Sequence, residues 1–168
     1  MGLLLYFDGL CEPINPGGIA TYGVVIFENK KVLKEEFGIV GAGFRGDNVS
    51  NNVAEYTALI RGLELIIESD LSEKDITIRG DSLLVIKQLI GKYRVKAPRL
   101  IPLYNKSINL LRNFKSYKIE WIPRENNEAA DVLSRKALRI FVEENFEEVS
   151  RFYGRKWAES VLNDTVLK

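Results

Sequence analysis

Four acidic residues in this chain each stand where a carboxylate meets an apolar segment, and they are the side chains best able to do chemistry. Asp8 follows Leu3-Leu-Leu-Tyr-Phe7, Asp81 follows the short strand-like segment 75–80, and Glu55 and Asp131 lie among alanines in two helix-like segments. Burying an unpaired carboxylate is costly. Taken singly, each also has a structural explanation as a turn residue, a hydrogen-bonding side chain or a helix-dipole partner.

The composition limits which reactions these residues could serve. The chain has no histidine, which excludes Ser-His-Asp and Cys-His nucleophiles and zinc-protease helices. Cys11 is the single cysteine, so the chain forms no internal disulfide and no thiolate zinc cluster, as is usual in the reducing cytosol. The N-terminus has no basic region or long apolar run, so we expect a cytoplasmic protein without a membrane segment. Carboxylates, lysines, hydroxyls or oxygen-bound metals remain.

The elements that must position the acidic residues begin with a strand over 3–7. Five apolar or aromatic residues predict a strand buried on both faces that delivers Asp8 to its exposed C-terminal end. Prolines and glycines over 10–18 predict a shaped loop, and two further strands over 21–27 and 32–40 predict an antiparallel meander. With 168 residues, of which 46% are apolar, the chain suits one domain with a full core.

A helix and a fourth strand bring the second carboxylate to the first. Residues 47–52 supply caps for a helix that runs to about Ser69, with Glu55 in its second turn. The strand over 75–80 ends in Gly-Asp, and another helix starts at Ser82. A crossover helix makes the first and fourth strands parallel, so Asp8 and Asp81 should emerge about 5 Å apart if the strands are neighbours. Two carboxylates that close predict a metal.

The segment 41–46 matches the dinucleotide pattern G-x-G-x-x-G. That pattern binds a pyrophosphate only where its glycines open a helix directly after a parallel strand. Here the preceding strand belongs to a hairpin, and the best helix start lies several residues later. We therefore expect a flexible glycine-rich connection.

The segment from Ile86 to Lys118 contains nine basic residues and no acidic one. Such a stretch is either a solvated face or a surface for a polyanion, and the tyrosines within it could stack on bases. Pro98 and Pro102 precede a predicted helix over 103–114, which is followed by a fifth strand over 117–122.

The last third of the chain divides into two patterns. A helix that starts near Glu128 carries Asp131 and runs to Ala137. From there an apolar ridge recurs every three or four residues: Leu138, Val142, Phe146, Val149, Tyr153, Trp157 and Val161. We predict a domain over 1–137 and an amphipathic helical extension over 138–168 that packs on the domain or on a partner.

Five motifs together carry a family resemblance: Tyr6-Phe-Asp8-Gly9, Asn15-Pro-Gly-Gly18, Ser50-Asn-Asn-Val-Ala-Glu55, Gly80-Asp81-Ser82 and Asn127-Glu128-Ala-Ala-Asp131. In this order, over residues 3–137, they resemble type 1 ribonuclease H. The resemblance implies an α/β fold of the ribonuclease H type, with a mixed five-stranded sheet (three strands antiparallel, two parallel) flanked by helices. It also implies an endonuclease that hydrolyses the RNA strand of RNA/DNA hybrids and leaves 5′-phosphate and 3′-hydroxyl ends.

By this resemblance the catalytic, metal-binding carboxylates are Asp8, Glu55, Asp81 and Asp131. Two divalent ions, Mg²⁺ or Mn²⁺, about 4 Å apart need shared and terminal oxygen ligands, and Asp8 would bridge them. Glu55, Gly9 and Asn51 resemble contacts to the RNA minor groove, where the 2′-hydroxyl distinguishes RNA from DNA. Asn15, Ser50 and Asn52 match positions that hold the DNA strand. We expect the duplex phosphates to contact Lys92, Arg94, Lys96, Arg99 and Arg124.

The chain departs from the family pattern in the loop before Asp131. Many members have a histidine there, whereas this chain has a shorter loop with Arg124, as in the archaeal-type branch. Some members of that branch also cut RNA/RNA duplexes, so a second substrate stays open. The alternative from another class is a non-catalytic module that binds hybrids or duplexes on the same fold. We expect a monomer rather than a homodimer.

Overall fold

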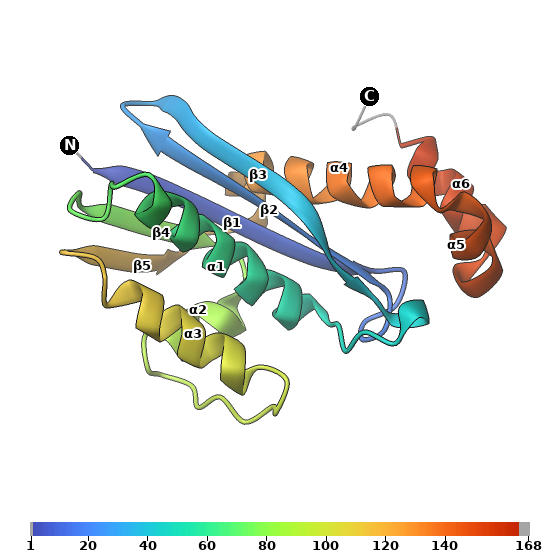
Figure 1. Ribbon diagram of the computed structural model, residues 1–168, viewed down its shortest axis with the longest axis horizontal. Helices are drawn as coiled ribbons and strands as arrows, with labels where there is room; N and C mark the ends of the chain where they lie inside the picture. The colour runs from blue at the N-terminus through green and yellow to red at the C-terminus, as the bar shows by residue number, and fades with distance from the viewer. Residues whose placement is uncertain (1, 165–168) are drawn as a thin grey trace.

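The computed structural model describes residues 2–164, which form one five-stranded sheet with helices on both faces (Figure 1). The strand order is β3-β2-β1-β4-β5, with β1–β2 and β2–β3 antiparallel and β1–β4 and β4–β5 parallel. The mixed sheet predicted from the sequence is therefore confirmed. The strands span Leu3–Glu12 (β1), Ile19–Glu28 (β2), Lys31–Ala42 (β3), Ile76–Gly80 (β4) and Tyr117–Trp121 (β5).

Strand β1 lies at the centre of the sheet, and its side chains alternate between two different environments. Leu5 and Phe7 are fully buried in the core on the α1 side, as expected for a strand covered on both faces. The next residue along, Asp8, points to the opposite face, where its carboxylate meets Ser134 of α4. The parallel pairing with β4 places Phe7 opposite Gly80, so Asp81 leaves the sheet beside Asp8, as predicted.

The strand end predicted at Asp8 is wrong. Pairing with β2 continues from Asp8 opposite Gly23 to Glu12 opposite Ile19, so β1 is longer than predicted and the expected loop over 10–18 starts only at Pro13. The prolines that suggested a loop from residue 10 all lie at or beyond residue 13. On its other edge β1 loses its partner where β4 ends at Gly80. Asp8 thus lies inside a strand that is paired on one side and open on the other.

Different helices cover the two faces of the sheet. Helix α1 (Asn51–Glu68) lies on one face, where Gly62 lets it approach Leu5 and Val24. Helix α4 (Glu128–Glu144) lies on the other, close to Gly23 of β2. Helices α2 (Leu83–Leu89) and α3 (Ile101–Leu111) complete the α1 side, with α3 starting two residues before the predicted Leu103. Ser50 caps α1 by accepting a hydrogen bond from Val53 N (3.1 Å), which confirms the predicted start.

Helix α4 runs without a break through the predicted domain division at 137/138. Two short helices, α5 (Phe146–Tyr153) and α6 (Arg155–Leu162), follow it. Their apolar side chains join the second half of α4 in a separate core that also contains Leu10, Ile19 and Ala42 from the far end of the sheet. Whether residues 1–137 form a domain by themselves stays a prediction.

The glycine-rich segment 41–46 forms a connection, as expected. Its first residues end the antiparallel edge strand β3, and Gly43–Arg45 form a short 3-10 helix, η1, well before α1 begins at Asn51. The geometry that a dinucleotide motif requires is therefore missing at this segment. Over residues 2–164 no helix is long and apolar enough to cross a membrane.

Candidate active site

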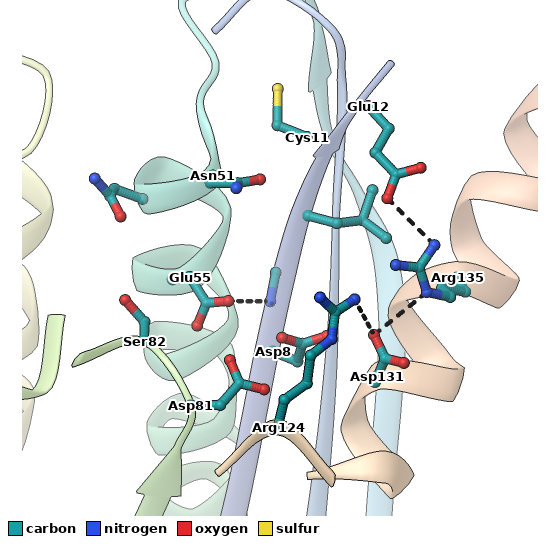
Figure 2. A pocket seen from close by; sticks show the side chains of 13 residues that line it. Asp8, Cys11, Glu12, Asn51, Glu55, Asp81, Ser82, Arg124, Asp131 and Arg135 are labelled. Carbon is teal, nitrogen blue, oxygen red and sulfur yellow. Dashed lines mark hydrogen bonds and ion pairs between the residues drawn. The ribbon is translucent and has the colours of Figure 1, made fainter. Parts of the chain in front are cut away.

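A polar cleft of about 300 Å³ lies at the open edge of β1, between the first turns of α1 and α4 (Figure 2). It contains all four acidic residues singled out from the sequence. Most of the predicted substrate contacts near them line it as well, so the following predicted residues meet in one place: Asp8, Gly9, Asn51, Asn52, Glu55, Asp81, Arg124 and Asp131.

Asp8 is the most central of the carboxylates. Its side chain is 6% exposed, and the Ser134 hydroxyl lies 3.1 Å from its Oδ2. Burial, together with the negative charges of Asp81 and Asp131, raises the pKa of Asp8 from 3.8 to about 7. Asp8 is therefore a weaker acid than an exposed aspartate, and a nearby positive charge would favour its ionised form.

Glu55 reaches the cleft from the second turn of α1. The Gly9 amide donates a hydrogen bond to its Oε1 (2.9 Å), while its Oε2 is buried without a hydrogen-bond partner among residues 2–164. Burial, followed by the charge of Asp8, raises the pKa of Glu55 well above its usual value. A Cβ at position 9 would lie 2.3 Å from the Ala54 carbonyl carbon, so α1 can approach β1 this closely only at a glycine.

Asp81 is held by a hydrogen bond from Asn127, the residue just before α4. The Asn127 amide Nδ2 donates to Asp81 Oδ2 (3.1 Å) and to the Phe7 carbonyl (2.9 Å), and Asn127 is fully buried. Burial raises the pKa of Asp81 more than this hydrogen bond lowers it. Asn127 therefore ties the middle of β1 to the residue that follows β4.

The three carboxylates Asp8, Glu55 and Asp81 converge. One oxygen atom from each lies within 4.8 Å of the other two, and no lysine or arginine among the described residues forms an ion pair with any of them. Hard divalent cations prefer such oxygen ligands. The free, buried Oε2 of Glu55 is one ligand atom that a cation would satisfy, so these residues fit a divalent metal ion.

Asp131 lies in the same cleft in a different environment. Its side chain is 25% exposed, and its Oδ1 lies 3.4 Å from Arg135 Nε and 4.0 Å from Arg124 Nη2. Arg135 also contacts Glu12 at 3.2 Å. Asp131 thus already has positive partners, and it is not one of the three residues whose oxygens converge.

The predicted substrate contacts fall into two groups. Those near α1 surround the cleft, where Asn15 Oδ1 accepts a hydrogen bond from the Asn51 amide (2.9 Å) and the Ser50 side chain caps the helix. Lys92 and Arg94 instead line a second hollow of about 550 Å³ with Tyr93 and Tyr104, in the connection between α2 and α3. Lys96 and Arg99 belong to the same connection but line neither hollow.

Sequence reasoning missed three residues that shape this site. Arg135 lies one helical turn after Asp131, and an i,i+4 search for opposite charges would have found it. The roles of Asn127 and Ser134 depend on contacts with residues more than a hundred positions away, and no local pattern signals them.

Comparison with known proteins places these features in context. A family model described as reverse transcriptase-like matches residues 7–137, which include all four acidic residues. Ribonuclease HI of Halobacterium salinarum is 39% identical over 133 residues, which are 79% of this chain and 62% of that protein. The crystal structure of RNase H1 from that organism has a TM-score of 0.71 at 36% identity and covers 82% of this chain and 98% of that one.

Two further relatives have comparable similarity. Bifunctional protein Rv2228c of Mycobacterium tuberculosis is 36% identical over 126 residues, 74% of this chain but only 32% of that protein. The structure of its N-terminal RNase H domain has a TM-score of 0.75 at 32% identity, covering 86% and 98% of the two chains. LC11-RNase H1, solved with an RNA/DNA hybrid, has a TM-score of 0.73 at 33% identity, covering 83% and 99%. This chain therefore spans about a third of the mycobacterial protein.

Proposed function

This chain belongs to the reverse transcriptase-like family and has the ribonuclease H fold, and from that premise we propose that it is an endonuclease for the RNA strand of RNA/DNA hybrids. The observation that carries the proposal is the convergence of Asp8, Glu55 and Asp81 without a basic partner. Relatives named ribonuclease HI support it, as does the hybrid bound to LC11-RNase H1.

The residues of the cleft suit two divalent ions, Mg²⁺ or Mn²⁺. Asp8, Glu55 and Asp81 would hold one, and Asp131 would complete a second site with Asp8. Bound metal ions of this kind lower the pKa of a water nucleophile and stabilise charge on the leaving oxygen. The expected products carry a 5′ phosphate and a 3′ hydroxyl.

The protein's own part in this reaction is to hold the carboxylates in place before the substrate arrives. Asn127 fixes Asp81, Ser134 fixes Asp8, and the Gly9 amide fixes one oxygen of Glu55. Each contact orients an acidic side chain that repulsion would otherwise push outward. Preorganised charge of this kind lowers the cost of reaching the transition state.

The substrate would lie across the cleft and the α2–α3 connection. Asn51 and Asn52 border the cleft beside Glu55, which suits contacts to an RNA 2′-hydroxyl. Lys92, Lys96 and the arginines of the same connection would bind phosphates of the duplex. We expect the protein to act in the cytoplasm as a monomer.

The decisive experiment is cleavage of a 5′-labelled RNA/DNA hybrid with Mg²⁺ or Mn²⁺. Wild type should cut it, while Asp8→Asn and Asp81→Asn should not, and Glu35→Gln on the exposed edge strand is the matched control that keeps full activity. Equal, slow degradation by wild type and both variants would refute the proposal. Tight hybrid binding without metal-stimulated cleavage would identify a binding module instead. An RNA/RNA duplex in a parallel reaction tests the second substrate.

A further inference from the structure

One hydroxyl group of the C-terminal helices forms hydrogen bonds with the backbone of two segments near the cleft. Tyr153, at the end of α5, donates a hydrogen bond to the Gly17 carbonyl (2.8 Å) and accepts one from the Phe44 amide (3.1 Å). Its ring packs edge-on against Phe44 and Trp157, at 5.9 and 6.0 Å between centroids. The hydroxyl therefore links two backbone segments, the loop 13–18 and η1, to a helix that lies beyond the family match.

Backbone hydrogen bonds hold the loop 13–18 close to the carbonyl that Tyr153 contacts. The Gly43 amide donates to the Gly18 carbonyl (2.9 Å), and the Gly17 amide donates to the Val49 carbonyl (3.1 Å). A Cβ at position 43 would lie 1.9 Å from the Gly17 carbonyl oxygen, so the two backbones are in direct contact. Fixing Gly17 thus fixes the whole loop against the start of α1.

The same loop places Asn15 against Asn51, which lines the cleft. The Asn15 side-chain oxygen accepts a hydrogen bond from the backbone amide of Asn51, the first residue of α1 (2.9 Å). Asn51, Asn52 and Glu55 follow in the first two turns of this helix and line the cleft. Hydrogen bonds from Tyr153 to Gly17 and from Asn51 to Asn15, joined by the backbone of the loop, therefore connect α5 to the residues beside the acidic cluster.

The C-terminal helices are themselves anchored to η1. The Phe44 ring stacks on Phe152 with centroids 5.1 Å apart, and Arg45 donates a hydrogen bond to Asn145 Oδ1 (3.0 Å). Figure 1 shows α5 and α6 beyond the end of α4, at the same end of the sheet as η1. No described hydrogen bond or ring contact joins Tyr153 to an acidic residue of the cleft, so its influence passes through the loop 13–18 and η1.

We propose that Tyr153 is a positioning residue for nucleic-acid binding, which holds the Asn15 loop in the conformation that receives the substrate strand. This inference rests on the proposed function, because it assigns the loop a nucleic-acid contact. The expected signature is weaker substrate binding with unchanged chemistry.

The test is the substitution Tyr153→Phe, which keeps the ring and removes the hydroxyl. We expect KM for the hybrid to rise about three- to tenfold, the effect of one lost hydrogen bond, while kcat changes less than about twofold. Tyr22→Phe is the matched control, because it removes a hydrogen bond of 2.7 Å to Glu36, away from the loop. Comparable KM values for Tyr153→Phe and Tyr22→Phe would overturn the proposal.

A second measurement separates this inference from the proposed function. Binding of a fluorescent hybrid to Asp8→Asn and to Asp8→Asn/Tyr153→Phe is compared by anisotropy in Mg²⁺, where no cleavage is needed. A three- to tenfold weaker Kd in the double variant supports the positioning role even if wild type cuts no hybrid. Equal Kd values refute the role, whereas absent cleavage by wild type refutes only the proposed nuclease.

Amide hydrogen exchange gives an independent readout of the loop. In Tyr153→Phe the amides of Phe44, Gly17 and Asn51 should exchange faster than in wild type, while amides in the centre of β1 should not change. Uniform acceleration across the sheet would indicate a general loss of stability and would contradict the positioning role.

Discussion

The acidic cleft contains two kinds of carboxylate. Asp8, Glu55 and Asp81 converge with no basic side chain paired to them, and burial raises the pKa of each. Asp131, in the first turn of α4, forms an ion pair with Arg135 and lies 4.0 Å from Arg124. Within the described residues no ion pair offsets the charge of the first group, although the charge of Arg124 favours ionised Asp81, whereas Asp131 has an ion pair of its own.

This difference indicates which part of the site depends on a cation. Two buried carboxylates and the half-buried Asp81 repel one another and lower the stability of the metal-free protein, and a bound cation would reverse that effect. Asp131 does not lower the stability of the metal-free protein in this way, because its arginine partners are already present.

The largest contrast should come from Asp8→Asn beside Asp131→Asn. Asp8→Asn should reduce cleavage at least about a hundredfold, yet raise the stability of the metal-free protein by about 1–3 kcal/mol at pH 8, because it removes a charge that burial disfavours. Asp131→Asn should also reduce cleavage, but it should not raise the stability, because it removes the favourable contact with the two arginines. Denaturant unfolding in EDTA measures both. Equal stabilisation by the two substitutions would remove the distinction.

Metal binding should stabilise wild type and not Asp8→Asn. At pH 8, Mg²⁺ or Mn²⁺ at a hundred times its Kd should increase the free energy of unfolding by about 2.7 kcal/mol, because the cation binds the folded cleft and not the unfolded chain. Thermal melts across a metal titration measure this. A similar increase in Asp8→Asn would show that the ions bind elsewhere.

The pH dependence of the metal-free protein should have an unusual sign. The folded pKa of Asp8 is raised from 3.8 to about 7, so between these values the folded state binds more protons than the unfolded state. Stability from this group is complete below about pH 4 and is lost as pH rises to about 7, by an amount on the order of 4 kcal/mol. Unfolding at pH 5 and pH 8 in EDTA checks this. Asp8→Asn should flatten the slope most, and Asp131→Asn should flatten it less, because the charge of Asp131 is a smaller cause of the raised pKa of Asp8 than burial.

The smallest effect should follow Arg135→Gln. Losing a partly exposed ion pair should cost about 0.5 kcal/mol of stability, and Asp131 would become more available to a cation, so the metal concentration for half-maximal cleavage should fall about two- to threefold. Arg155→Gln is the matched control, since it also breaks an i,i+4 pair of 3.4 Å, remote from the cleft. A higher metal requirement in Arg135→Gln would mean that the arginine mainly orients Asp131.

The sequence was sufficient for the parts of the site that depend on topology. A crossover helix implied that the first and fourth strands are parallel, which brings Asp8 beside Asp81 if the strands are neighbours, and the pairing of β1 with β4 confirms that they are. The end of β1 could not be predicted, because it depends on how far β2 pairs with it beyond Asp8. The link from Tyr153 to Gly17 was also beyond sequence reasoning, since an apolar ridge indicates burial but does not indicate which carbonyl a hydroxyl will meet.

The hydrogen bonds that fix the carboxylates also determine when the site can exist during synthesis of the chain. Gly9 bonds to Glu55 across 46 positions, whereas Asn127 reaches Phe7 across 120 and Ser134 reaches Asp8 across 126. At about 5–20 residues per second, a ribosome needs roughly 6 to 25 seconds between making Asp8 and making Ser134. During that time β1 has its acidic residue but not the helix that orients it. A partly made chain should therefore be unable to cut nucleic acid, and cleavage should begin only once α4 has docked.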